Sequence, residues 1–456
     1  MADSAGNDKK NSPSIKLAKE EKKTEQDIIE SSPVLVLFKK DAHEAMLNRI
    51  NMSSAFKLSP EELYSEIENF VFEFARERRA QVTRREQKII ANELVDDMIG
   101  LGPLEPLLSD EGITDIVVNG PNQVYVERGG IMRLTSAKFR NDQHALQIAQ
   151  RIAHRIGRRV DTSSPLCDAR LADGSRVNIV VPPIAIDGVS ISIRKFSKKT
   201  YTLDDLSRFG ALSKSMVQVL QIASTCGLNI IVSGGTGSGK TTLLNALSQL
   251  ISPNERIVTC EDAAELKLLQ PHVVRLESRP PNIEGKGEIT IRDLVVNSLR
   301  MRPDRIVVGE VRGTECVDML QAMNTGHDGS MSTVHANSAK ECFIRLENMV
   351  AMSGFGLPTD VVRAQIAGAI NIVIQTARLY DGSRKVTEIV EVTGISSNYE
   401  IQYQPLFKFE PLGTDENEKI IGKFVACTDS PAFLPKTIAY GLDKKLLEIM
   451  KAAQNE

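Results

Sequence analysis

A glycine-rich stretch that ends in lysine and threonine is the part of this sequence best suited to chemistry. Residues 230–242 read IIVSGGTGSGKTT, which places the spacing G-x-x-x-x-G-K-T directly after an apolar run. Glycines adopt backbone angles closed to other residues, so successive N–H groups of such a loop can converge on phosphate oxygens. Lys240 would add a positive charge for the β and γ phosphates, and Thr241 a hydroxyl for Mg²⁺. The stretch therefore predicts a binding site for a nucleoside triphosphate. Its predicted contacts are Gly234, Gly235, Thr236, Gly237, Ser238, Gly239, Lys240, Thr241 and Thr242.

Two further apolar segments end in carboxylates that could serve the same ligand. Residues 256–262 read RIVTCED, and residues 305–310 read RIVVGE. If both are parallel strands, their C-terminal ends face the crevice that also holds the glycine-rich loop. Glu261 and Glu310 are then candidate Mg²⁺ partners, partly through water, and Glu310 is the candidate that orients or deprotonates an attacking water. The alternative is that two buried strands simply end in acids at the surface.

Two histidines follow in a segment of small residues. Residues 325–338 read TGHDGSMSTVHANS, with His327 and His335 in it. Either side chain could donate a hydrogen bond to the γ phosphate, and the residues alone are equally compatible with a structural role. Because no further histidine or cysteine lies nearby to complete a ligand set, a metal site formed by these histidines is not expected.

The elements that must position these residues alternate between strand and helix. The apolar residues 230–232 predict a buried strand, and LLNAL at 243–247 predicts a helix after the loop. Such alternation from residue 207 onward predicts a parallel sheet with helices on both faces. From residue 380 the pattern is typical of strands, and a helix is expected over 444–453, but the sequence assigns this part no role.

The chain before residue 207 has a different texture. It predicts short strands around a helix over 144–159, and helical spacing earlier, where Ser59 and Pro60 mark a helix start. A basic run over 76–85 is mixed with acids, which favours a solvated helix face over contact with lipid or nucleic acid. The predicted division is a disordered tail over 1–31, a helical bundle over 32–99, an α+β domain over 100–196, a linker over 197–206 and the nucleotide-binding domain over 207–456.

Composition limits the class of protein. The chain has 456 residues, 41% hydrophobic and 25% charged, with a net charge of -3, and at roughly 150 residues per domain this predicts about three units. Six scattered cysteines without a C-x-x-C pair indicate neither zinc nor a disulfide framework. The N-terminus lacks the order of a signal peptide, and no segment offers the roughly 20 apolar residues of a membrane span. A cytoplasmic protein is expected.

Four of the segments resemble, in the same order, the Walker A, Asp box, Walker B and His box of secretion and pilus-assembly ATPases of the type II/type IV secretion superfamily. They are GGTGSGKTT at 234–242, TCEDAAEL at 259–266, RIVVGEVRG at 305–313 and TGHDGSMSTVHANS at 325–338. Segments 100–121 and 272–305 are similar to the CpaF subfamily, which drives tight-adherence (Flp-type) pili. The missing C-x-x-C pairs also favour that subfamily over the zinc-bearing branch.

The resemblance implies a fold and a set of roles. The fold is α/β, with a RecA-like P-loop ATPase domain preceded by a PAS-like α+β domain and a small helical bundle. Glu310 is then the Walker B acid, Glu261 stands in the Asp box beside the metal, and His327 and His335 are the His-box pair. Arginines of this family reach the triphosphate when the N-terminal domain closes; Arg194 is the best match, and Arg275 and Arg279 are further candidates. From the residues alone, each arginine would be assigned to a surface ion pair.

The function implied is that of an ATP-hydrolysing motor. The family implies a homo-hexamer with Mg²⁺ as cofactor at the cytoplasmic face of the inner membrane, which moves a membrane platform protein and acts indirectly on pilin. Pilus extension, retraction or both remain open. A nucleic-acid translocase is a rival class, but 5% aromatic residues, no Trp and an acidic balance speak against it. A nucleotide-gated scaffold is another, against which Glu310 and the histidines argue. No N-K-x-D motif supports a GTPase switch.

Overall fold

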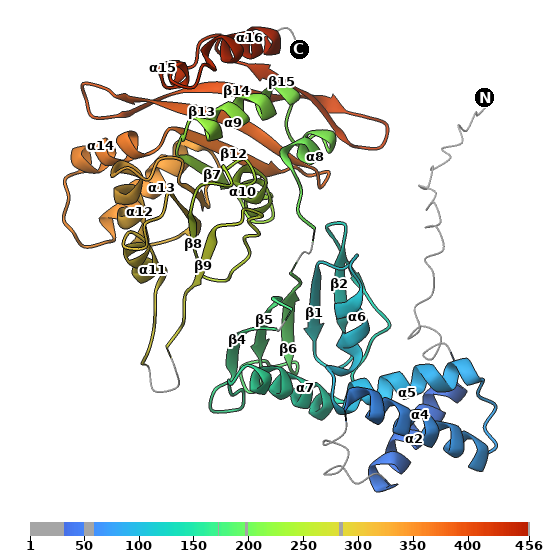
Figure 1. Ribbon diagram of the computed structural model, residues 1–456. Coiled ribbons are helices and arrows are strands. Elements are labelled where there is room, and N and C mark those ends of the chain that lie inside the picture. The colour runs from blue at the N-terminus through green and yellow to red at the C-terminus, as the bar shows by residue number, and fades with distance from the viewer. Residues whose placement is uncertain (1–31, 50–58, 172, 197–198, 282–285, 455–456) are drawn as a thin grey trace, which may run out of the picture. The chain divides into compact units, whose positions relative to one another are not determined.

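The computed structural model describes residues 32–49, 59–171, 173–196, 199–281 and 286–454 (Figure 1). The chain divides into two compact units, Met1–Phe196 and Ser197–Glu456, and each is described by itself. The tail predicted over 1–31 lies outside the described residues, as do residues 197–198 of the predicted linker.

Helices α2, α4 and α5 pack together at the start of the first unit and share a core that includes Met46, Ile67 and Leu94 (Figure 1). α4 begins where the sequence places a helix start, because Ser59 and Glu62 form a reciprocal capping box. The helices of this unit are α2 (Pro33–Arg49), α4 (Pro60–Glu77), α5 (Arg84–Met98), the 3-10 helix η1 (Gly102–Leu104), α6 (Glu105–Ser109) and α7 (Asp142–Arg155).

The rest of the first unit is an antiparallel sheet whose described strands follow the order β3-β2-β1-β6-β5-β4. The apolar face of α7, with Ile148 and Ile152, shares one core with Ile116 and Ile191 of the sheet. The strands are β1 (Asp115–Asn119), β2 (Val124–Arg128), β3 (Ile131–Leu134), β4 (Leu166–Arg170), β5 (Arg176–Val180) and β6 (Ser190–Arg194).

This unit differs from the expectation in several elements, among them α7, β3 and β4. α7 ends at Arg155 and does not reach Arg159, since Gly157 adopts a left-handed conformation with φ of +70° and stops the helix. β3 was not expected, because all its side chains are exposed and it therefore shows no alternation of apolar and polar residues.

The second unit is built on one sheet with the described order β15-β14-β13-β12-β7-β11-β10-β8-β9. The strands from β12 to β9 run parallel, and β13, β14 and β15 extend the sheet in antiparallel fashion. The strands are β7 (Ile230–Gly234), β8 (Ile257–Glu261), β9 (Val273–Glu277), β10 (Arg305–Val311), β11 (Met331–Val334), β12 (Ile372–Arg378), β13 (Arg384–Ile395), β14 (Ile401–Thr414) and β15 (Ile420–Ala426). This is the mixed α/β architecture that the alternation of elements predicts.

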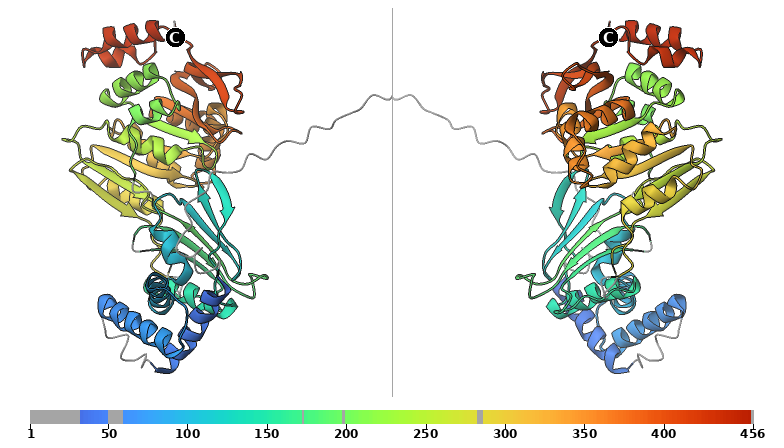
Figure 2. Two further views of the ribbon diagram at one scale, coloured as in Figure 1. Left: turned by 90° about the vertical axis from the view of Figure 1, so that its right-hand side faces the viewer. Right: turned by 90° about the vertical axis from the view of Figure 1, so that its left-hand side faces the viewer.

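Two apolar cores cover the faces of this sheet. One contains Val232 of β7 together with Leu446 and Met450 of α16, and Figure 2 shows α16 beside α9. The other contains Ile231 and Val308. The helices are α8 (Leu203–Arg208), α9 (Lys214–Thr225), α10 (Lys240–Ser248), α11 (Ile291–Ser298), α12 (Glu315–Asn324), α13 (Ala339–Ala351), α14 (Thr359–Ala369), α15 (Leu434–Ile438) and α16 (Asp443–Ala453).

The linker predicted over 197–206 is interrupted by structure. α8 begins inside it at Leu203, because Thr202 and Asp205 form a capping box. Elsewhere, none of the helices that the structure describes is both long and apolar enough to span a bilayer.

Candidate nucleotide site

The glycine-rich loop joins the buried strand β7 to α10. Every residue of β7 is buried, and α10 begins at Lys240 directly after the loop. Gly237 and Gly239 adopt φ of +70° and +98°, which L side chains rarely tolerate. The loop thus has the strand, turn and helix order that a phosphate-binding loop requires.

Position 234 requires glycine because neighbouring atoms leave no room for a side chain, and not because of its backbone angles. A Cβ added there would lie 2.4 Å from Thr376 Oγ1 and 2.5 Å from both Ser238 Oγ and the Thr376 carbonyl oxygen. Ser238 Oγ lies 2.9 Å from Thr376 Oγ1, within hydrogen-bond distance, and Thr376 Oγ1 donates to Ser233 O at 3.0 Å. The neighbouring strand β12 therefore holds the loop in shape.

Arg384 of β13 supports the loop from a second strand. Its Nε donates a hydrogen bond to Gly237 O at 2.9 Å. β12 and β13 are hydrogen-bonded to each other as an antiparallel pair. The two residues that hold the loop, Thr376 and Arg384, therefore lie on one pair of strands.

A chain of polar contacts runs from the loop to the end of β10. Lys240 Nζ donates to Gly234 O and to Gly235 O, each at 3.0 Å. The same Nζ lies 3.1 Å from His335 Nε2, which lies 2.9 Å from Glu310 Oε1. The other oxygen of Glu310 accepts a hydrogen bond from Arg312 at 2.7 Å. Lys240, His335 and Glu310, which the sequence predicts separately, thus meet at one place.

His335 Nε2 cannot serve both of its neighbours at once. As a donor it would hold Glu310 Oε1, and as an acceptor it would take a proton of Lys240. In the described structure it faces Lys240, and Glu310 Oε1 is buried without a well-aligned donor despite the 2.9 Å approach. A carboxylate oxygen left open beside a phosphate-binding lysine fits a metal-bound or nucleophilic water.

Burial and charge shift the protonation equilibria of these groups. Burial is the main cause that lowers the pKa of Lys240, with Glu310 acting in the opposite direction. Burial also lowers the pKa of His335; the carboxylate of Glu310 opposes this shift, and the positive charges of Lys240, Arg312 and Arg345 add to it. The hydrogen bond to Glu310 raises the pKa of Arg312. His335 is therefore neutral at neutral pH.

Glu261 ends β8, as expected, but its carboxylate is already occupied. Only 2% of the residue is exposed. Its Oε2 accepts hydrogen bonds from the backbone N–H groups of Glu265 and Leu266 at 2.7 and 2.8 Å. Burial raises its pKa, although these hydrogen bonds and the charge of Arg275 oppose the rise. Glu261 thus fixes the turn after β8, and any contact with a metal would run through its second oxygen.

The structure separates His327 from His335. His327 precedes β11, and its Nδ1 lies 3.2 Å from Ala322 O at the end of α12. His335 follows β11, at the end of the sheet that carries the glycine-rich loop. A strand lies between the two histidines, so the structure does not bring His327 to the loop of its own chain.

The predicted arginines lie in different surroundings. Arg275 donates to Ala264 O at 3.2 Å, and its charge opposes the rise in the pKa of Glu261. Arg279 donates to Gly287 O at 2.7 Å, in the segment after β9. Arg194 of β6 is paired with Asp115 at 3.3 Å within the first unit. The structure therefore groups only Arg275 with a predicted acid of the nucleotide-binding unit.

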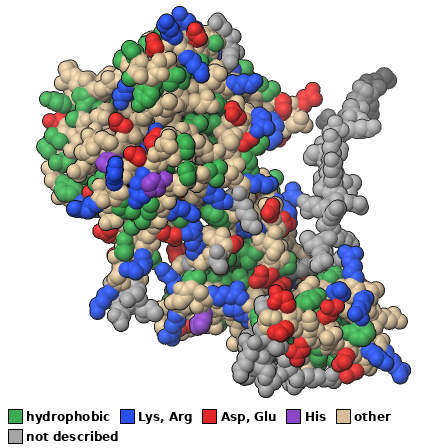
Figure 3. Space-filling view, in the orientation of Figure 1, with side chains coloured by type: hydrophobic (Ala, Val, Ile, Leu, Met, Phe, Trp, Pro, Cys, Tyr) green, Lys and Arg blue, Asp and Glu red, His purple; other side chains and the backbone are tan. Residues whose placement is uncertain are grey.

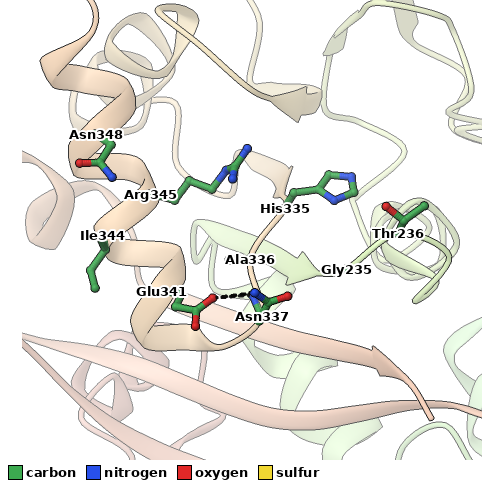
Figure 4. A pocket seen from close by; sticks show the side chains of 9 residues that line it. All are labelled: Gly235, Thr236, His335, Ala336, Asn337, Glu341, Ile344, Arg345 and Asn348. Carbon is green, nitrogen blue, oxygen red and sulfur yellow. Dashed lines mark hydrogen bonds between the residues drawn. The ribbon is translucent and has the colours of Figure 1, made fainter. Parts of the chain in front are cut away.

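An open cavity of about 440 Å³ adjoins the glycine-rich loop (Figure 4). Gly235, Thr236 and the segment from His335 to Asn337 line one side of it, and α13 lines the other. Arg345 extends from α13 toward the segment that carries His335. Arg345 has no ion pair among the described residues, which leaves its charge available to an anion in the cavity.

Sequence reasoning missed Arg312, Arg345, Thr376 and Arg384. Arg312 had a signal, because residues i and i+2 at the end of a strand point to the same side, and Glu310 precedes it by two. Arg345 lies on a helix outside the matched motifs, and Thr376 and Arg384 reach the loop from strands far along the chain. For these three the sequence alone carries no signal.

The chain is similar to known proteins of one family. Residues 97–420 match the family model described as type II/IV secretion system protein. A Mycobacterium tuberculosis (strain H37Rv) protein named for conjugal transfer is 42% identical over 302 residues, which cover 65% of this chain and 85% of that protein. The type IV secretion system protein VirB11 of Bartonella quintana is 32% identical over 63% of this chain and 91% of its own length. The crystal structure of the VirB11 ATPase of Brucella suis covers 63% of this chain and 94% of its own, with 30% identity and a TM-score of 0.35.

Proposed function

Because this chain belongs to the type II/IV secretion system protein family, we propose that it hydrolyses ATP as the motor of a secretion or pilus machine. The main observation in support is the series of contacts from Lys240 through His335 to Glu310. It adjoins a glycine-rich loop whose shape is held by hydrogen bonds from β12. Glu310 Oε1 is buried without a well-aligned donor, although His335 Nε2 lies 2.9 Å away, and the lysine of the phosphate-binding loop is the other neighbour of that nitrogen. Hydrolysis needs such an oxygen to orient water.

Mg²⁺ fits the residues of the site. The described residues contain no cluster of three or more histidine, cysteine or carboxylate side chains suited to a metal. Mg²⁺ in nucleotide sites needs no such cluster, since phosphate oxygens and water supply most of its ligands. Thr241 and Glu310 would hold the ion, with Glu261 acting through water. The ion would supply charge neutralisation at the β and γ phosphates.

The protein side chains have distinct proposed roles. Lys240 would exchange one of its loop carbonyls, Gly234 O or Gly235 O, for a phosphate oxygen, since all three of its protons have acceptors within reach. That exchange would release His335 Nε2 from Lys240. Glu310 would hold the attacking water through Oε1 while Arg312 fixes its other oxygen. Positioning and charge are the main contributions that phosphoryl transfer requires of the protein.

We extend the proposal to the assembly. The second unit is proposed to be RecA-like and the α+β part of the first unit PAS-like. Six copies would form a ring at the cytoplasmic face of the inner membrane. There the ring would move a platform protein and act indirectly on the pilin of a tight-adherence pilus. Arg194, with Arg279 as a further candidate, would offer charge to the phosphates when the units close. The motif order and the segments similar to the CpaF subfamily support this finer proposal.

The test is steady-state ATP turnover per subunit as a function of protein concentration, with Glu310→Gln as the variant. Turnover that rises with concentration and falls by at least about 100-fold in Glu310→Gln, with ATP binding retained, is the expected result. Turnover independent of concentration would remove the ring-coupled part of the proposal. Absence of turnover at every concentration would contradict the proposed ATPase activity and favour a nucleotide-gated scaffold. Stimulation by single-stranded DNA with a steep salt dependence would instead favour a nucleic-acid translocase.

A further inference from the structure

A second, larger cavity lies in the first unit and shares no lining residue with the cavity beside the glycine-rich loop. Its volume is about 1040 Å³, at the upper end of the range for small-ligand sites. α7 and the residues on either side of it form most of the wall, and α2 and α5 contribute the rest. The lining residues are His43, Asp97, Met98, Arg140, Asn141, Gln143, His144, Gln147, Gln150, Arg151, His154, Arg155, Arg158, Arg159, Val160 and Asp161.

The charge of this cavity is opposite to that of the chain. Among the described lining residues, five arginines stand against two aspartates, so the formal charge of the wall is positive even with its histidines neutral. The whole chain has a net charge of -3. α7 contains a single acid, Asp142 in its first turn. In Figure 3 blue side chains and a purple histidine gather over the part of the molecule where α7 lies. The wall thus carries both signs, with an excess of positive charge.

Some of these arginines have a structural task that also fixes their position. Arg151 donates to Asp97 O at 3.1 Å and to Gly100 O at 2.5 Å, and Arg155 donates to Ile99 O. These carbonyls lie at the C-terminal end of α5, where helix carbonyls lack partners of their own. The two guanidinium groups thus join the helical bundle to the α+β part and are held rigid at the cavity wall.

Other basic groups in the wall have no such task. The side chains of Arg158 and His154 form no hydrogen bond or ion pair with any residue that the structure describes, while Arg159 is paired with Asp161. Gln143 and Gln147 occupy the same helix face as His154 and offer neutral donors and acceptors. Fixed guanidinium groups, an unpaired arginine and several amides form a surface suited to phosphate oxygens next to a polar, uncharged body.

We infer that this cavity binds a phosphate ester, with Arg158 and the fixed Arg151 and Arg155 contacting its phosphoryl oxygens. The volume exceeds what one inorganic phosphate needs, so the ligand has an organic part or more than one phosphoryl group. The same chemistry is offered by a soluble phosphate ester and by the headgroup of an anionic phospholipid. A purely structural explanation is that basic residues near the end of α7 complement its helix dipole. This accounts for Arg155 but not for the concave wall around Arg158.

The test uses the full chain with Lys240→Ala, which removes the lysine of the nucleotide loop as a competing phosphate site. Binding of pyrophosphate is measured by calorimetry. Binding to vesicles of phosphatidylglycerol is measured by sedimentation, against vesicles of phosphatidylcholine. Arg158→Gln is the test variant, and Arg176→Gln, an exposed arginine on β5 outside the cavity, is the matched control.

The expected result is binding that weakens at least about tenfold in Arg158→Gln and changes little in Arg176→Gln, with equal melting temperatures for both variants. Binding to pyrophosphate but not to anionic vesicles would identify the ligand as a soluble phosphate ester. Binding to anionic vesicles but not to pyrophosphate would identify it as a lipid headgroup. The inference is overturned by no binding to either probe, by equal losses in both variants, or by a single-stranded oligonucleotide that displaces both probes at lower concentration.

Discussion

Glu310 Oε1 and His335 Nε2 lie 2.9 Å apart at the ends of two neighbouring parallel strands, β10 and β11. The third partner, Lys240 Nζ, lies 3.1 Å from the same nitrogen. One nitrogen therefore stands between the residue proposed to hold phosphate and the residue proposed to hold water. Its protonation decides which of the two it contacts, and this makes His335 sensitive to whether phosphate is bound.

Replacing His335 should lower turnover more than replacing His327. We expect His335→Gln to reduce kcat by about 100-fold, the lower end of the range for a lost acid–base group. His327→Gln is the matched control, since a strand separates it from the loop. Steady-state ATP hydrolysis by both variants checks this. Equal losses in the two would mean that His327 acts at a site the single chain does not contain.

The pH dependence of turnover should reflect the low pKa of His335. Because burial lowers that pKa, the imidazole stays neutral as pH falls to 6.5 and takes a proton only below that value. Wild-type kcat should therefore hold between pH 8 and about 6.5. A pH–rate profile measured beside His335→Gln provides the check. An acid limb centred at or above pH 6.5 that vanishes in His335→Gln would contradict the neutral histidine.

Arg312 should act as a positioning residue for Glu310. It binds Glu310 Oε2 at 2.7 Å and lies 3.7 Å from Asp262. We expect Arg312→Gln to lower kcat about tenfold, equivalent to about 1.4 kcal/mol, while the KM for ATP changes little. Arg312→Lys should restore part of the activity because it keeps the charge. A change confined to KM would show that Arg312 serves binding and not the position of Glu310.

Two adjacent glycines should respond very differently to alanine. At Gly234 a Cβ would meet Thr376 and Ser238 at 2.4–2.5 Å, whereas at Gly235 it would meet nothing within 4 Å. We therefore expect Gly234→Ala to weaken ATP binding by at least about tenfold through the strain it imposes on the loop, with a much smaller loss in Gly235→Ala. Titration with a fluorescent ATP analogue compares them. Similar affinities would show that β12 does not hold the loop shape.

Asp96 gives the first unit an unusual pH dependence. Burial, and then the carboxylates of Glu105, Asp97 and Glu93, raise its pKa to about 7 from 3.8. Between these values the folded state binds the extra proton, so this group favours folding at low pH and the advantage is lost as pH rises toward 7. Asp96→Asn should raise the melting temperature at pH 8 by at least about 2 °C, and by clearly less at pH 5, where only part of the interval between the two pKa values has been crossed.

The measurement is thermal unfolding at the two pH values, with Glu73→Gln, an exposed carboxylate on α4, as the control. His144 works in the opposite direction, because burial and then the charge of Arg140 lower its pKa to about 3, so acid destabilises it below about pH 6.5. An equal gain for Asp96→Asn at pH 5 and pH 8 would reject the raised pKa.

The sequence predicted the parts of the site that depend on local patterns. A buried strand, a glycine-rich loop and a helix follow one another in the sequence, so the structure of residues 230–248 could be predicted from local patterns alone. The contacts that hold the loop could not be predicted from the sequence. Thr376 and Arg384 are far from the loop along the chain and reach it only because their strands pair within the sheet. The separation of His327 from His335 was readable in principle. The four residues of β11 between them extend for about 13 Å and carry the two histidines to opposite edges of the sheet.

The shared core of β7 and α16 has a consequence during synthesis of the chain. Val232 packs in the same cluster as Leu446 and Met450, and β12, which braces Gly234, also comes long after the loop. A ribosome therefore releases the glycine-rich loop well before its supports exist. Nascent chains that stop short of α16 should lack a formed nucleotide pocket, and ATP cannot act as an early folding template for this unit.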